Sequence, residues 1–196
     1  MRVRAPDADE DNDDAVALPA EQCAFASGIV ELVGQVHPNC QISRNAQLVV
    51  SDFIEMNLHK ILKHILHADK ETVQQVTKER VLSTLPSVIA DEELLKFAIQ
   101  EIEKEKDEQP MLLPLIQTFF TKQYEGEGRL TCEMDGFRTL SLFTEYLTAE
   151  ILELAGNVVR DGHSQMITAD AIMNLDDPAV DLLLDYCVAG NATKGA

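Results

Sequence analysis

The same helical pattern occurs twice along the chain, and this repeat limits the possible fold more than any other feature. In each half a long amphipathic segment lies between shorter ones. The first begins after Ser43, and its apolar residues return with a period near 3.6 from Ala46 to Leu66, over about six turns. The second runs from about Met134 to Arg160. Because such a unit cannot cover its own broad apolar face, we expect two of them to clasp head to tail.

Shorter helices surround the two long ones. The pattern predicts them over residues 23–36, after Thr77, over residues 91–106 and 113–122, after Thr168 and over residues 180–188. The apolar face of the second long helix is predicted to consist of Phe137, Leu140, Phe143, Leu147, Ile151, Leu154 and Val158. With only 5% aromatic residues and no Trp, the apolar content suits helices packed on helices. These patterns predict an all-α protein.

The chain is strongly acidic, with 34 acidic residues, 16 Lys and Arg, and a net charge of −18. Residues 109–196 hold 13 acids and 5 bases, and the preceding residues hold 21 and 11, so both halves are acidic. A free-standing DNA-binding protein usually has the opposite sign, because each phosphate contact needs a cation. Residues 1–20, with six acids between Asp7 and Asp14, are expected to form a disordered tail. Such a tail is either simply solvated or competes with DNA for basic surfaces.

Several classes of protein are disfavoured by the sequence. The four cysteines lack regular spacing, which indicates free thiols in a reducing compartment. There is no run of eighteen apolar residues, and the first residues do not form a secretion signal. His64 and His67 could share a metal ion, but no Cys or carboxylate completes a site. We therefore expect no metal, no cofactor and no enzymatic activity, and a flexible end over residues 189–196.

Four runs of sequence resemble core histones. EYLTAEILELAGN, from Glu145 to Asn157, is similar to the long central helix of histone 2A, and Arg160-Asp161 follows as in that family. The other three runs are similar to histone 2B, and they are QVHPNCQIS (35–43), VTKERV (76–81) and ELLKFAI (93–99). The resemblance covers roughly residues 23–184, and its runs occur in the histone order.

The resemblance implies two histone folds in tandem, a 2B-like fold over residues 21–108 and a 2A-like fold over residues 109–188. They would pack as an intramolecular handshake dimer. Fused doublets of this kind are a feature of large DNA viruses of eukaryotes such as the marseilleviruses. The implied function is a 2B–2A-type subunit, main or variant, of a viral nucleosome that compacts DNA with a 4–3-type doublet. Its implied location is the host nucleus or viral factory, and the virion.

Many cations that histones direct at DNA are missing here. The segment matching the Arg-rich first helix of histone 2A, residues 114–124, keeps only Lys122, and the loop 162–166 has no cation. The candidate residues that remain for binding double-stranded DNA, without sequence preference and weakly, are Ser43, Arg44, Lys78, Arg80, Lys122 and Arg129. Each could equally be an ordinary surface residue. Arg160 is expected to be structural and to pair with nearby acids.

The resemblance also implies an acidic patch that docks basic peptides. Its candidate residues are Glu145, Glu150, Glu153, Asp176 and Asp177, although Pro178 and the two residues after it depart from the family pattern. A solvated acidic face is the alternative for each residue. The charge also leaves open a different function, an acidic histone-binding module, chaperone-like or a decoy, that does not itself wrap DNA. Histone-fold transcription factor subunits share the fold, but the EYLTAEILELAGN run favours histone 2A.

Overall fold

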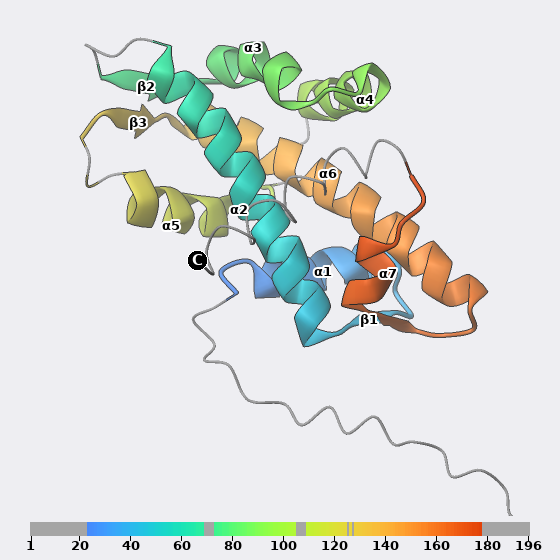
Figure 1. Ribbon diagram of the computed structural model, residues 1–196. Coiled ribbons are helices and arrows are strands. Elements are labelled where there is room, and N and C mark those ends of the chain that lie inside the picture. Colours follow the sequence, from blue (N-terminus) through green and yellow to red (C-terminus); the bar gives the residue numbers. More distant parts are fainter. Residues whose placement is uncertain (1–22, 69–72, 105–108, 125, 127, 178–196) are drawn as a thin grey trace, which may run out of the picture.

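The computed structural model describes residues 23–68, 73–104, 109–124, 126 and 128–177, and in this part the protein is all-α, as predicted. Very short strands occur only between the helices (Figure 1). In chain order the elements are α1 (Ala26–Val36), β1 (Gln41–Ile42), α2 (Arg44–His67), β2 (Gln74–Val76), α3 (Lys78–Val88), α4 (Glu92–Glu103), α5 (Leu113–Tyr124), β3 (Leu130–Cys132), α6 (Met134–Asp161), β4 (Met166–Ile167) and α7 (Ala169–Met173). The predicted segment 180–188 and both chain ends lie outside the described residues.

Helix starts are fixed by the capping residues that the sequence indicates. The side chain of Ser43 accepts a hydrogen bond from the backbone N–H of Ala46 at 3.2 Å, at the start of α2. Thr77, Asp91 and Thr168 cap α3, α4 and α7 in the same way. Each cap satisfies a backbone donor that has no partner within its helix. Three helices therefore begin where the sequence predicts, directly after Ser43, Thr77 and Thr168.

Two pairs of short parallel strands join the first half of the chain to the second. β1 pairs with β4, and the N–H of Gln41 donates to the carbonyl of Gln165 at 2.7 Å. β2 pairs with β3, and the N–H of Gln74 donates to the carbonyl of Arg129 at 2.9 Å. Since β1 precedes α2 and β4 follows α6, the start of α2 lies beside the end of α6. At the other end, β2 follows α2 and β3 precedes α6, so the end of α2 lies beside the start of α6. The two long helices therefore run in opposite directions across each other (Figure 1).

The short helices of one half pack on the long helix of the other. α1, α3 and α4 all contact α6, and α7 contacts α2. As a result one core contains residues of both halves, among them Phe53 and Leu58 of α2 and Leu140 and Phe143 of α6, all at most 1% exposed. Neither half encloses its apolar residues alone, so burial in either half depends on the other.

The predicted apolar face of α6 is wrong at its C-terminal end. Val158 is 51% exposed, whereas Val159 is buried. The buried face passes from Ile151 through Ala155 to Val159 in steps of four residues. The sequence pattern favours the larger Leu154 and Val158 because Ala155 is small, yet Ala155 lies on the buried side of the helix.

Two glycines allow parts of the two halves to approach each other closely. A Cβ atom at Gly136 would lie 2.3 Å from the carbonyl oxygen of Val76, so this glycine lets the first turn of α6 rest against β2. A Cβ at Gly156 would overlap the ring of His37. That ring is buried, and its Nε2 lies 2.9 Å from the carbonyl oxygen of Glu153, to which it donates as the Nε2–H tautomer.

Substitution of Gly136 by Ala is expected to destabilise the protein. The new methyl group meets backbone rather than a flexible side chain, so the junction of β2 with α6 must shift. We expect a loss of about 1–3 kcal/mol in the free energy of unfolding, measured by urea denaturation followed by circular dichroism.

The matched control is the same substitution at Gly34, an exposed glycine of α1 with nothing within 4 Å of a built Cβ. Gly34→Ala should stabilise by about 0.5–1 kcal/mol, because Ala is the better helix former. Equal stabilities for the two variants would show that the close approach at Gly136 is unimportant.

Candidate nucleic-acid interface and acidic cluster

The structure divides five of the six candidate DNA-binding residues between the two ends of α2. Ser43 and Arg44 lie where β1 and β4 pair, a region we call the β1–β4 end. Lys78, Arg80 and Arg129 lie where β2 and β3 pair, the β2–β3 end. Lys122 is exposed in the last turn of α5. The predicted cations therefore form two groups, and Lys122 belongs to neither pair of strands.

Each pair of strands places two helix N-termini side by side. α2 and α7 begin directly after β1 and β4, and α3 and α6 begin directly after β2 and β3. The backbone N–H groups at a helix N-terminus carry partial positive charge and favour anions such as phosphate. The sequence predicts the start of each helix but not this juxtaposition, because the paired segments lie more than fifty residues apart along the chain.

The β1–β4 end has the charge distribution better suited to a phosphate. The first turn of α2 contains no acidic residue, and Arg44 is exposed there. Ser43 uses its hydroxyl to cap the helix, so it acts through the N-terminus that it fixes. The only acid in the first turn of α7 is Asp170. Arg44 and the adjoining backbone donors therefore form the strongest candidate contact with DNA.

The cations at the β2–β3 end are offset by acids in the neighbouring helix starts, namely Glu79, Glu133 and Asp135. A backbone hydrogen bond and the Thr77 side chain hold the pKa of Glu79 below its usual value, so this carboxylate keeps its charge. Arg80 donates to the side chain of Gln74 at 2.5 Å and to the carbonyl of Gln75 at 3.3 Å, which holds its guanidinium against β2. The β2–β3 end therefore attracts a phosphate group less strongly than its three cations alone would.

The contact that the described residues give Arg160 is not the ion pair predicted for it. Within the described residues, its guanidinium donates to the side-chain oxygen of Asn157 at 2.8 Å, three residues earlier on α6. Asp161 follows directly in sequence, and neighbours one residue apart on a helix do not face each other. The contact at the end of α6 is therefore between a cation and an amide.

Acidic side chains from three parts of the chain gather on α6. The pKa of Glu150 is raised, chiefly by burial, and further by the charges of Glu153, Asp177 and Glu101, while a hydrogen bond from Tyr146 opposes the shift. We call Glu101, Glu150, Glu153 and Asp177 the acidic cluster. Three of its members were predicted. Glu101 was not, because it lies on α4 and reaches α6 only through packing between the two halves.

Glu145 lies away from the acidic cluster and has a structural contact. Its Oε1 accepts a hydrogen bond from the backbone N–H of Leu112 at 2.7 Å, directly before α5. It precedes Glu150 by five residues, which is about 140° around the helix. Asp176 is exposed and follows α7, and it is not among the charges that raise the pKa of Glu150.

Within the described residues no group of three or more His, Cys, Asp or Glu side chains could hold a metal ion. The helices of this part of the chain include none that is long and apolar enough to cross a membrane. No protein-family model matches the sequence, and neither does any curated protein. The residues and contacts themselves therefore carry any assignment of function.

Neutralising Glu150 is expected to stabilise the protein at neutral pH. A carboxyl whose pKa is higher in the folded than in the unfolded state makes the protein less stable as pH rises through that range. Glu150→Gln should raise Tm at pH 7 by a small amount, on the order of 1 °C for a half-exposed group that water screens. The difference should vanish below about pH 4, where the wild-type carboxyl is also neutral.

Thermal unfolding of both proteins between pH 3.5 and 8 measures this difference. Glu31→Gln, which neutralises an exposed carboxyl on α1, is the control and should show no comparable gain. A Glu150→Gln protein that melts below the wild type at pH 7 would contradict the burial of this carboxyl.

Proposed function

We propose that the chain is a structural histone doublet, a 2B-like fold over residues 21–108 joined to a 2A-like fold over residues 109–188. It acts without catalysis as a 2B–2A-type subunit of a viral nucleosome and compacts DNA together with a 4–3-type doublet. The observation that carries the proposal is the crosswise pairing of β1 with β4 and of β2 with β3. A handshake of two short-long-short units requires the loops of one unit to lie beside the loops of the other.

Contact between the histone-like runs supports the proposal. His37 belongs to the run that resembles histone 2B, and Glu153 and Gly156 belong to the run that resembles the central helix of histone 2A. The imidazole of His37 packs on Gly156 and binds the Glu153 carbonyl. The residues that carry the resemblance therefore lie at the junction of the two halves, where an intramolecular histone dimer would need them.

The proposed doublet would hold DNA weakly. Its best candidate contact is Arg44 with the start of α2, whereas acids offset the cations at the β2–β3 end. Both halves repel phosphate through their net charge. A 4–3-type partner would then supply most of the DNA affinity, and the outer turns on this subunit would unwrap easily. Its place of action would be the host nucleus or viral factory, and the virion.

The second candidate function is an acidic module that binds histones without wrapping DNA, chaperone-like or as a decoy. The observation that favours it is the placement of Glu79, Glu133 and Asp135 in helix starts where a DNA-wrapping protein would gain from cations. The acidic cluster offers basic peptides a surface in either function. The two proposals differ in one measurable property, which is whether the subunit extends the DNA protected by its partner.

Nuclease digestion of reconstituted complexes distinguishes the two functions. Tetramers of histones 3 and 4 serve as the stand-in for the 4–3-type partner, with and without this chain, on the same DNA. We expect the chain to lengthen the protected fragment, because its helix starts add contacts beyond those of the tetramer. Fragments of unchanged length, with the chain bound to the tetramer, would refute wrapping and support the histone-binding module.

Removal of two cations should weaken DNA association in a salt-dependent manner. The double variant Arg44→Ala, Arg129→Ala is compared with the wild type in its binding constant K for the tetramer–DNA complex at several salt concentrations. The slope of log K against log salt should become less steep by up to about 1.8. The control is Lys96→Ala, on the exposed face of α4. Equal slopes for the double variant and the control would remove both arginines from the interface.

A further inference from the structure

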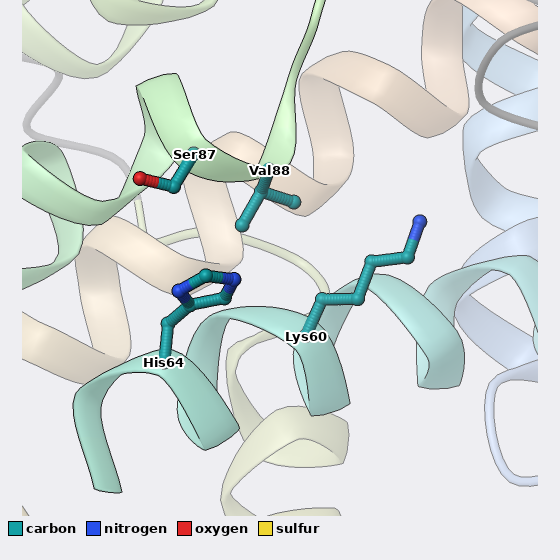
Figure 2. Close-up of a pocket in the computed structure, with 4 residues that line it drawn as sticks. All are labelled: Lys60, His64, Ser87 and Val88. Carbon is teal, nitrogen blue, oxygen red and sulfur yellow. The ribbon is translucent and has the colours of Figure 1, made fainter. Parts of the chain in front are cut away.

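A basic groove lies along the C-terminal part of α2 and reaches the end of α3. Two adjoining hollows form it, and His64 lines both. One, of about 410 Å³, is bounded by Lys63, His64, His67 and Ala68 at the end of α2. The other, of about 220 Å³, is bounded by Lys60 and His64 of α2 and by Ser87 and Val88 of α3 (Figure 2). We call the two hollows together the α2–α3 groove.

The groove has a charge opposite to that of the chain. The twelve residues from Asn57 to Ala68 include two lysines and three histidines and no acid, in a protein of net charge −18. Lys60, Lys63, His64 and His67 follow the spacing i, i+3, i+4, i+7, which places them on one side of the helix. The acids nearest in sequence are Asp69, directly after Ala68, and Asp91, three residues after Val88, where its side chain caps α4. The cations on this side of α2 favour an acidic occupant.

The chain itself supplies an acidic segment of suitable size within reach. Residues 7–14 contain six acids and lie outside the described residues, as does all of the chain before Cys23. The Cys23 thiol contacts the carbonyl of Gln47 near the start of α2, and Lys60 lies about 20 Å further along that helix. The eight residues between Asp14 and Cys23, which make nine Cα–Cα steps, can span up to about 30 Å. The tether is therefore long enough to bring the acidic run to the groove.

We propose that the acidic run at residues 7–14 docks in this chain's own α2–α3 groove. Its carboxylates would contact the Lys60 and Lys63 ammonium groups. The hydroxyl of Ser87 and the side chain of Val88 would line the edge of the docking site. Attachment to the same chain gives the run a local concentration in the millimolar range, so modest charge pairing is enough to hold it. This inference concerns the isolated chain and needs neither DNA nor a histone partner, so it stands or falls independently of the proposed function.

Zero-length carbodiimide cross-linking of the full chain, read by mass spectrometry, tests the docking. The reagent joins a carboxylate to an amine only when the two are in contact. We expect amide links from residues 7–14 to Lys60 or Lys63, at least several-fold more abundant than links to the exposed Lys96 of α4. The links should fall sharply in 1 M salt, which screens exposed charges.

The matched variants separate this docking from general charge attraction. One variant replaces the six acids by Asn and Gln, and the other carries Lys63→Gln and His64→Gln, both at exposed positions. A labelled peptide of residues 5–16 should bind the first variant about tenfold more tightly than the wild type, because no tethered competitor occupies the groove. It should bind the second variant no better than the wild type.

Other results would overturn the proposal. Links spread evenly over Lys96 and Lys122 would show that the acidic run is only solvated, and links chiefly to Lys78 would place it at the β2–β3 end. In a mixture of isotope-labelled and unlabelled chains, links between the two kinds of chain would show that the acidic run docks on a second copy. In a last outcome, the acid-free variant binds a short DNA duplex and not the peptide, and loses that binding when Lys63→Gln is added. This result would make the groove a nucleic-acid surface.

Discussion

The crosswise pairing of loops is the constraint on which the rest of this structure depends. Two short parallel strand pairs hold the segment before α2 beside the segment after α6, and the segment after α2 beside the segment before α6. With both ends fixed, the two long helices must cross, and their apolar faces meet in one core. The strands contribute few hydrogen bonds, but they determine which faces become buried, and burial provides most of the stability.

The same pairing determines where the molecule can meet an anion. Parallel strands that each lead into a helix bring two helix starts together, and so bring together the N–H groups at both starts. The protein offsets this field with carboxylates at the β2–β3 end and leaves it largely intact at the start of α2. Contacts between the halves are therefore well developed, whereas the surfaces suited to phosphate are uneven. In the proposed function, the chain would depend on protein contacts more than on DNA.

Features encoded by neighbouring residues could be predicted from the sequence, and features that depend on packing could not. The caps at Ser43 and Thr168 follow from local chemistry, and the structure has both. The α6 face turns toward Val159 because Ala155 lies on the buried side, and a hydrophobic pattern gives so small a residue little weight. Glu101 joins the acidic cluster only because α4 packs on α6. Glu101 and Glu150, for example, are 49 positions apart in the sequence.

Acidic and basic side chains gather on different surfaces of this protein. The acidic cluster on α6 and the α2–α3 groove lie on different elements, and each concentrates one sign of charge. A net charge of −18 keeps copies of the chain apart in solution but also opposes folding through self-repulsion. Docking the most acidic segment on the basic side of α2 would relieve part of that repulsion within a single chain. It would also leave the acidic cluster exposed, because the groove is built from α2 and α3 and the cluster from α4 and α6.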